Sequence, residues 1–412
     1  MEKCKVLLLS THDSHLGGHA WAEMQQYDKD KYDTKLVTLY SLTGSKEYAI
    51  IANYSLYRNL DLLLRIIANM VAFGRIRRIS REKYCYFRYN YFPISAKRIL
   101  RKYNNGNPDA IVLHWCDGFI SPKLLYNLYK LTGATIHICF TDEHALGGGC
   151  HYPCDCKEYE SGCKSCPALL TNKKVAAKFL ERKLRYFSLF PKVVIANGYC
   201  IEKAKQSRIF KYRTSYIHEF SGVTLSHKPD YIESRERYNI SNSDFVIMFG
   251  ALNMNEERKG LHILFKALEI VSERLNVKIT ALVPGQIEYD FTKLKNINVH
   301  LLGVLQFDDL CKAYAASNVY VSPSLADSGP IMVKYAIACG VPVVSFPIGN
   351  ALDFVKHKQT GYLAKYADPE DFANGIMFFW ENRQYSEDFR NNCLRLNESA
   401  CTDFTYHYEV RK

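Results

Sequence analysis

Short apolar runs rich in β-branched residues alternate with helix-length segments along nearly the whole chain, and this alternation limits the fold more than any other feature. Such runs are typical of buried parallel strands joined by crossover helices. We therefore expect an α/β protein with parallel sheets between layers of helices. The expected strands are Lys5–Ser10, Thr34–Leu39, Ala110–His114, Ala134–Phe140 and Val193–Asn197 in the first half, and Phe245–Gly250, Val277–Val283, Val299–Gly303, Val319–Pro323 and Val341–Phe346 in the second.

The two halves of the chain begin in the same way, with an apolar strand, a loop that carries glycine or positive charge, and a helix. The loop contains Gly17 and Gly18 in the first half and Arg258, Lys259 and Gly260 in the second. Because 412 residues exceed what one core usually holds, we predict two Rossmann-like, doubly wound domains that face one another across a cleft. The polar stretch HEFSGVTLSHKPD marks the boundary between them. The expected parts are residues 1–215, residues 216–390 and a helical C-terminal segment, residues 391–412.

No stretch of the sequence is expected to cross a membrane or to direct secretion. A spanning helix needs about 20 nearly unbroken apolar residues, and the best stretch, Leu60 to Phe73, contains Asp61, Arg65 and Asn69. The apolar run in the N-terminal MEKCKVLLLSTHD is too short for a secretory signal. We therefore expect a cytoplasmic protein whose 14 cysteines serve in packing or metal binding rather than in disulfides.

Positive charge is concentrated in a segment at about residues 55–105 that is also rich in tyrosine and phenylalanine. Between Arg58 and Lys102, twelve Lys and Arg face only Asp61 and Glu82, which gives a net charge of +10 within a total of +12. This mixture suits an anionic membrane, where cations meet head groups and rings lie at the interface. A solvated flank of an inserted helical element is the alternative. Single-stranded nucleic acid also attracts such segments, but the chain resembles no nucleic-acid motif, so we expect no nucleic acid as a partner.

The segment Leu325 to Phe346 contains the clearest candidate for an anion site. Asp327 and Ser328 precede Gly329 and Pro330, and proline is favoured at the start of a helix. The free N–H groups at such a helix start bind anions, and glycine lets a phosphate approach the backbone. A well-capped helix–strand corner without a ligand would show the same pattern.

Two loops that follow expected strands are further candidates. Arg258 and Lys259 lie between a strand end and an amphipathic helix, and two cations held there can neutralise a diphosphate. A surface turn is the simpler explanation of this loop alone, but the Asp327 segment in the same half favours the diphosphate. Gly17 and Gly18 would let the backbone approach a ligand, although such a pair is also common in plain turns.

A cysteine-rich loop follows the expected strand Ala134–Phe140. Cys163 and Cys166 have the spacing of a metal chelate, and Cys150 and Cys156 would complete a tetrahedral thiolate zinc site. Such a site would be structural, because four thiolates saturate the metal. Free buried thiols and disulfides are the alternatives.

A polar group also follows the strand Ala110–His114. His114, Trp115 and Asp117 stand where that strand ends, and in parallel sheets ligands bind outside the carboxyl ends of the strands. A single histidine is more often structural, but we expect His114 to face the ligand-binding edge.

With these residues laid out, the chain resembles glycosyltransferase family 4, the retaining nucleotide-sugar transferases of GT-B fold. The resemblance covers most of the chain and is specific in the stretch TDEHALGGGCHY…GCKSCP and in the pair RKG and DSGPIMVKYAIACGVPVVSF. The cysteine-bearing stretch is similar to members that act in bacterial surface-polysaccharide assembly. The resemblance implies a donor held by the C-terminal domain, an acceptor held by the N-terminal domain, and a final helix that crosses back to the first domain.

The resemblance also assigns donor-binding residues. Arg258 and Lys259 match the diphosphate-binding cations, and Asp327 matches the first acid of the E-x7-E signature. Tyr335 stands where the second acid binds the ribose, so the choice between a UDP-sugar and a GDP-sugar is left open. The donor-binding residues so implied are Gly17, Gly18, Arg258, Lys259, Ser328, Gly329, Pro330, Ile331 and Tyr335.

The residues at the reacting centre follow from a second departure. Thr141 replaces a histidine that many members carry before the aspartate equivalent to Asp142. The catalytic role therefore falls to Asp142, His114 or His144 on the acceptor side, with Asp327 on the donor side.

The reaction implied is the transfer of a hexose-type sugar from a nucleotide-sugar, with retention, to a lipid-linked saccharide at the inner face of the cytoplasmic membrane. No catalytic cofactor or divalent metal is implied, because cations stabilise the leaving diphosphate. The alternatives are a GT-B epimerase or phosphorylase and a non-catalytic sugar-binding partner.

Overall fold

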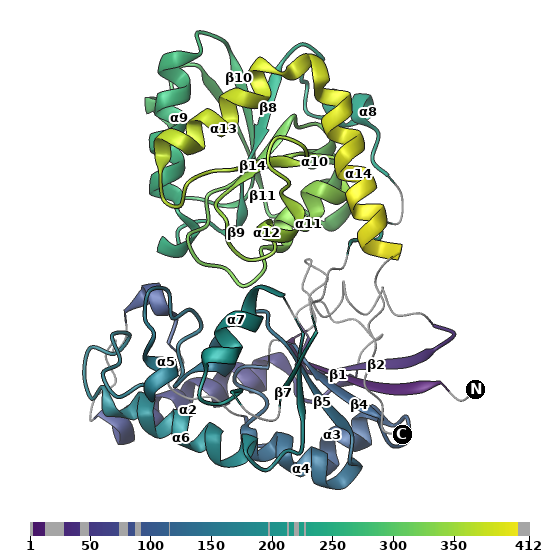
Figure 1. Ribbon diagram of the computed structural model, residues 1–412, viewed down its shortest axis with the longest axis vertical. Helices are drawn as coiled ribbons and strands as arrows, with labels where there is room; N and C mark the ends of the chain where they lie inside the picture. Colours follow the sequence, from purple (N-terminus) through teal and green to yellow (C-terminus); the bar gives the residue numbers. More distant parts are fainter. Residues whose placement is uncertain are drawn as a thin grey trace. The chain divides into compact units, whose positions relative to one another are not determined.

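The computed structural model describes residues 3–12, 29–41, 49–73, 81–86, 92–114, 116–196, 198–211, 214–217, 222–225 and 228–402. The chain forms two compact units, one up to Glu219 (unit 1) and one from Phe220 to Phe404 (unit 2). Each contains a parallel sheet with helices packed on it (Figure 1). The predicted α/β class with two Rossmann-like domains is therefore confirmed.

The sheet of unit 1 has the strand order β3-β2-β1-β4-β5-β6-β7, and all neighbouring strands are parallel. The centre of the sheet is formed by strands whose side chains are almost all buried, which is why continuous apolar runs were needed there. All five strands expected in this half are present. The strands are β1 Cys4–His12, β2 Tyr32–Tyr40, β3 Ala49–Ile50, β4 Ala110–Leu113, β5 Thr135–Cys139, β6 Val193–Ala196 and β7 Thr214–Ile217.

The helices of unit 1 begin and end at residues with known capping roles. Ser95 and Ser121 accept hydrogen bonds from the first turns of α3 and α4, and Gly133, with φ of +64°, ends α4. None of the described helices of the protein is long and apolar enough to span a membrane. The helices are α2 Tyr54–Phe73, α3 Ala96–Tyr103, α4 Pro122–Thr132, α5 Glu158–Ser161, α6 Lys174–Phe187 and α7 Gly198–Gln206, with 3₁₀ turns η1 Glu82–Tyr84 and η2 His144–Leu146.

The sheet of unit 2 has the order β11-β10-β8-β12-β13-β14, and β9 pairs with β10 beside this path. All the pairs are parallel, and the five strands expected in this half are present. The strands are β8 Phe245–Met248, β9 Ala251–Asn253, β10 Ile279–Gln286, β11 Ile297–Gly303, β12 Val319–Ser322, β13 Val343–Ser345 and β14 Gly361–Leu363.

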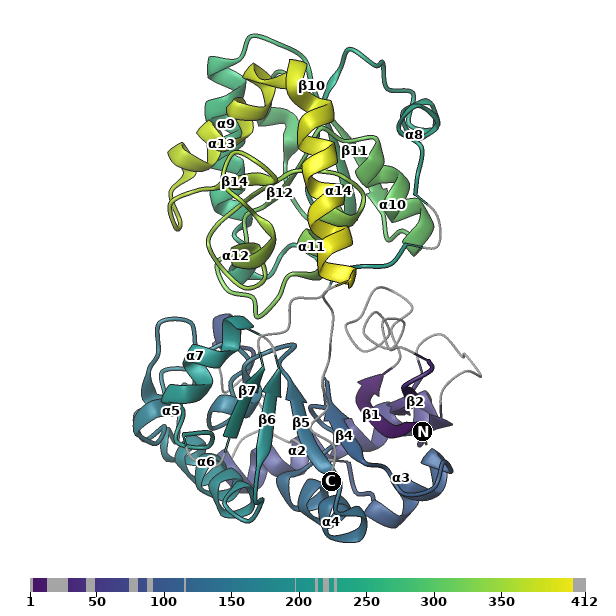
Figure 2. The same cartoon turned by 45° about the vertical axis from the view of Figure 1, so that its right-hand side comes forward.

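The helices of unit 2 include the two that sequence patterns had placed after the charged loop and after Pro330. Helix α14 packs against α11 (Figure 2), and Asn397 on α14 accepts a hydrogen bond from the backbone N–H of Val223. A return of the chain end to unit 1 would fall on residues 403–412, outside the described part. The helices are α8 Tyr231–Arg237, α9 Leu261–Arg274, α10 Phe307–Ala315, α11 Ile331–Ala338, α12 Ala351–Phe354, α13 Pro369–Glu381 and α14 Ser386–Thr402, with 3₁₀ turns η3 Glu257–Lys259, η4 Phe291–Lys293 and η5 Arg383–Tyr385.

Candidate active site

The cationic loop of unit 2 lies against the end of β12. Arg258 and Lys259 belong to η3, and Gly260, with φ of +69°, turns the chain into α9. A Cβ atom at Gly260 would lie 1.9 Å from the carbonyl oxygen of Pro323, so only glycine allows this close approach. The backbone N–H of Leu325 donates a hydrogen bond of 2.7 Å to the Arg258 carbonyl. The loop that carries the cations is therefore fixed to the segment that carries Asp327.

Asp327 is the centre of a charged cluster. Its Oδ2 lies 2.8 Å from Lys259 Nζ and 3.2 Å from Arg258 Nη1, and its Oδ1 accepts a hydrogen bond of 3.2 Å from the N–H of Gly329. Arg258 Nε also contacts Glu256, at 2.7 Å. Asp327 is only 7% exposed; burial alone would raise its pKa, but Lys259 and Arg258 hold the pKa below its ordinary value.

The turn that begins α11 lies directly beside this cluster. Ser328 is fully buried and Pro330 occupies the position before the first helical residue, Ile331. Gly349, with φ of +54°, packs so closely that a Cβ atom there would lie 2.7 Å from Pro330 Cδ. The sequence-predicted phosphate turn, residues 328–331, is thus brought together with both cations and with Asp327.

Tyr335 lies one turn further along α11 and is buried. Its side chain is 1% exposed, and its ring packs edge-on against Phe307 with ring centroids 5.0 Å apart. Burial raises the pKa of its phenol. Within the described residues its hydroxyl has no hydrogen-bond partner, and its contact with a ribose stays a prediction.

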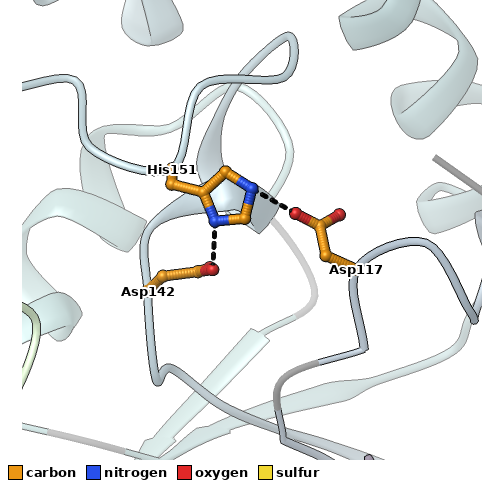
Figure 3. A group of neighbouring side chains, drawn as sticks. All are labelled: Asp117, Asp142 and His151. Carbon is orange, nitrogen blue, oxygen red and sulfur yellow. Dashed lines mark hydrogen bonds and ion pairs between the residues drawn. The ribbon is translucent and has the colours of Figure 1, made fainter. Parts of the chain in front are cut away.

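In unit 1, His151 lies between two carboxylates that follow adjacent strands (Figure 3). Its Nδ1 is 2.5 Å from Asp142 Oδ2, and its Nε2 is 2.5 Å from Asp117 Oδ2. Burial would lower the pKa of His151, but the two carboxylates raise it to about 10, so the ring is an imidazolium at neutral pH. The other oxygen of Asp117 lies 2.9 Å from Nδ1 of His144, whose pKa burial lowers.

The loop that carries these groups is held by its backbone carbonyls. Lys183 Nζ on α6 donates to the carbonyl of His144, at 2.5 Å, and to that of Gly147, at 2.7 Å. Ser207 Oγ donates to the carbonyl of Leu146, at 2.8 Å. Lys183 is 3% exposed, and burial lowers its pKa. Hydrogen bonds from side chains outside the loop therefore fix its backbone conformation.

A pocket of about 90 Å³ opens beside this cluster at the ends of β4 and β5. Its polar lining residues are His114, Asp117, Ser121, Asp142, His144 and Lys183. Apolar side chains form the remaining wall, a mixture that is common in small-molecule sites.

The pocket brings together the candidate catalytic residues of unit 1. His114, Asp142 and His144 were expected at the reacting centre from sequence, whereas Asp117 and His151 were not assigned a role. Only their places in the sequence pointed to a role for these two residues. Asp117 follows the end of β4, and His151 is next to Cys150 in the cysteine-rich loop.

The predicted zinc ligands lie in the loop that contains His151. Cys163 and Cys166 are buried, Cys150 and Cys156 are half-buried, and all four are free thiols. Burial raises the pKa of Cys150, and the other three thiols raise it further. Within the described residues, however, only Asp117, Asp142 and His151 bring three metal-type ligand atoms within 4.8 Å of one another. The zinc site stays a prediction, and Gly17 and Gly18 lie outside the described residues.

Known proteins similar to this chain match mainly in part of its length. An uncharacterized glycosyltransferase of Methanocaldococcus jannaschii is 27% identical over 163 residues, which are 37% of this chain and 41% of that protein. The sulfoquinovosyl transferase SQD2 of Arabidopsis thaliana is 27% identical over 170 residues, 39% of this chain and 32% of that protein. The chain thus spans less than half the length of these relatives.

Solved structures match over nearly the whole chain and bear on the fold alone. Sucrose-phosphate synthase from Thermosynechococcus elongatus has a TM-score of 0.60 at 14% identity and covers 97% of this chain and 95% of its own. These are GT-B proteins, so the expected GT-B fold is confirmed. Residues 230–395 match the family model "Glycosyl transferases group 1". Unit 2, with the Arg258–Lys259–Asp327 cluster, therefore carries a domain of the glycosyl transferases group 1 family.

Proposed function

We propose that the protein is a retaining glycosyltransferase that moves a hexose-type sugar from a UDP- or GDP-sugar to a lipid-linked saccharide in surface-polysaccharide assembly. The observation that carries the proposal is the cluster of Arg258, Lys259 and Asp327 beside the start of α11, within the matched family domain. Two cations and a helix N-terminus at one point are suited to a diphosphate.

The donor diphosphate would replace the carboxylates that now face the cations. Arg258 contacts Asp327 and Glu256, and Lys259 contacts Asp327. When the bond between the sugar C1 and the diphosphate breaks, its electron pair passes to the phosphate oxygen, and the two cations stabilise that charge. A well-placed donor of this kind contributes about 3–4 kcal/mol to transition-state stabilisation.

The acceptor would bind in unit 1, where the pocket lined by His114, Asp142 and His144 lies at the strand ends. The acceptor hydroxyl forms the new bond to C1 on the face that the diphosphate leaves, and its proton passes to the departing phosphate. Retention follows from attack on the same face. This scheme gives the side chains of unit 1 the task of orienting the hydroxyl.

A lipid-linked acceptor requires the enzyme to work at the inner face of the cytoplasmic membrane as a peripheral protein. The basic segment supports this placement, because each Lys or Arg near an anionic surface contributes about 1 kcal/mol of attraction. The four thiols of Cys150, Cys156, Cys163 and Cys166 are a suitable donor set for a structural zinc. That metal would stabilise the loop and take no part in the transfer.

The proposal is tested first by thermal unfolding with UDP, GDP, ADP, dTDP or CMP, with magnesium and with EDTA. A ligand at 100 times its dissociation constant stabilises by about 2.7 kcal/mol. We expect a shift with UDP or GDP that Lys259→Ala abolishes and that EDTA leaves unchanged. Lys266→Ala is the matched control, because Lys266 is an exposed cation on the adjoining helix α9.

The second test is glycosyl transfer from the sugar nucleotide of the responding base to an octyl glycoside, followed by NMR of the anomeric proton. Retention is expected. A folded protein that responds to no nucleotide, or a product of inverted configuration, would contradict the proposal.

A further inference from the structure

Helix α2 presents a row of large apolar side chains to solvent. Leu56, Leu63, Ile67 and Met70 are exposed and follow one another at steps of seven, four and three residues, so they share one face of the helix. Val71 beside them is 84% exposed. Soluble proteins rarely expose so many neighbouring apolar groups without a partner.

The exposed face is not what holds α2 on unit 1. Tyr57 is buried, and its ring stacks on Tyr40 with centroids 4.4 Å apart. Tyr57 also contacts Phe92, and Leu60 packs against the core of unit 1. Leu60 lies four residues after Leu56, at the edge of the exposed row, so the core covers only the flank of the helix that carries Tyr57 and Leu60. The exposed side chains from Leu56 to Val71 are left for another contact.

We propose that this face of α2 docks on an anionic lipid bilayer, with the helix in the plane of the interface and its apolar row among the upper parts of the acyl chains. The inference gives the membrane partner of the proposed function a defined surface, and in that respect it rests on that function. An interfacial helix of this kind combines an apolar face with nearby cations.

The charge around α2 is complementary to acidic head groups. Arg58 on the helix and Arg81 beyond it are exposed, and so are Lys97, Arg101 and Lys102 on α3. Helix α3 is close to the start of α2, since Arg98 Nη2 donates to the carbonyl of Ile51. The segment as a whole carries +10.

The same charge disfavours a second copy of this chain as the occupant. Association of two copies through α2 would bring two segments of +10 together, whereas a bilayer that contains phosphatidylglycerol attracts them. A bilayer is also continuous, so it can accept an apolar row without a shaped groove opposite it. We therefore commit to the lipid surface.

The test is co-sedimentation of the full chain with vesicles of phosphatidylcholine, alone or with about one third phosphatidylglycerol, and without any acceptor lipid. The variant is Leu63→Gln with Ile67→Gln. The matched control is Leu131→Gln with Leu189→Gln, which removes two leucines of unit 1 with similar exposure, 49% and 48%, that do not lie on α2. Circular dichroism and the melting temperature without ligand confirm that each variant is folded.

We expect the wild type to bind the anionic vesicles and the α2 variant to bind at least tenfold more weakly, because burial of one leucine or isoleucine alone contributes a factor of about ten. The control should stay within twofold of wild type. Wild-type binding that is lost in high salt but unchanged in the α2 variant would show that charge acts alone and would overturn the inference. It would also be overturned by the absence of vesicle binding, or by a wild-type dimer that the α2 variant dissociates. Since no acceptor is present, these results are separate from success or failure of glycosyl transfer.

Discussion

Replacement of Asp327 by asparagine removes a carboxylate that both Arg258 and Lys259 contact. The side chain keeps its shape and an oxygen for Lys259, but the charge that faces Lys259 at 2.8 Å and Arg258 at 3.2 Å is lost. We expect a less stable unit 2 and, at the proposed donor site, two cations that no longer face the charge of Asp327. Affinity for inorganic pyrophosphate should therefore rise while the free energy of unfolding falls.

The size of the loss follows from the burial of the cluster. Removal of one partner from a buried ion pair costs about 3–5 kcal/mol. The side chains of Lys259 and Arg258 are 15% and 13% exposed, so water compensates in part, and we expect about 2–3 kcal/mol. For a domain of this size the melting temperature should fall by about 4–12 °C.

The effect should depend on pH. The cations hold the pKa of Asp327 below its ordinary value, so its contribution is complete above about pH 4 and is lost as the pH falls through the folded-state pKa. Thermal unfolding of wild type and Asp327→Asn should differ most at neutral pH and converge in acid. Glu398→Gln is the control, because its pair with Lys228 is exposed and should matter by less than about 1 kcal/mol. A shift below about 1 °C, or one undiminished in acid, would refute the reasoning.

Three further changes test the two sites. Arg258→Ala should lower kcat/KM by about 100-fold through the lost stabilisation of the leaving diphosphate, as steady-state kinetics can show; an unchanged value would exclude Arg258 from the donor site. His151→Ala removes the cation that the buried Asp117 shares with the half-buried Asp142, so urea unfolding at neutral pH should show a loss of about 3–5 kcal/mol. Gly260→Ala should weaken UDP or GDP binding in calorimetry, since its Cβ meets a backbone carbonyl. Gly303→Ala, also at positive φ but with open space around its Cβ, should cost only about 1–2 kcal/mol of stability and leave binding unchanged.

The sequence was most informative about the central strands. All ten expected strands occur, and nine of them lie inside their sheets, where a strand covered on both faces must be apolar throughout. The tenth, β11, is an edge strand whose side chains are mostly half-buried or exposed. The sequence pattern does not predict four short strands, β3, β7, β9 and β14. Three of them, β3, β7 and β14, form sheet edges, where few apolar residues are needed.

The cluster around Asp327 was predictable because its parts are contiguous motifs, whereas the cluster around His151 was not. Asp117 and His151 are 34 positions apart, and they meet only because β4 and β5 are neighbours and the loop after β5 folds back. The spacing of residues in the sequence does not show that this loop folds back toward the end of β4. The exposed face of α2 was hidden for a related reason: Asp61 and Arg65 ruled out a membrane-spanning helix, but only the packing of Tyr57 shows which side of the helix the core uses.

The hydrogen bonds that hold the loop after β5 affect how the proposed acceptor pocket can change during evolution. Lys183 and Ser207 donate hydrogen bonds to main-chain carbonyls of this loop, and every amino acid has such a carbonyl. Ala145 lies in the 3₁₀ turn η2 and lines the pocket, and its side chain takes no part in these hydrogen bonds. Exchange at this position would reshape the wall of the pocket while the turn keeps its course. Single substitutions at such positions would therefore change what the proposed acceptor pocket binds while the backbone that forms it is kept.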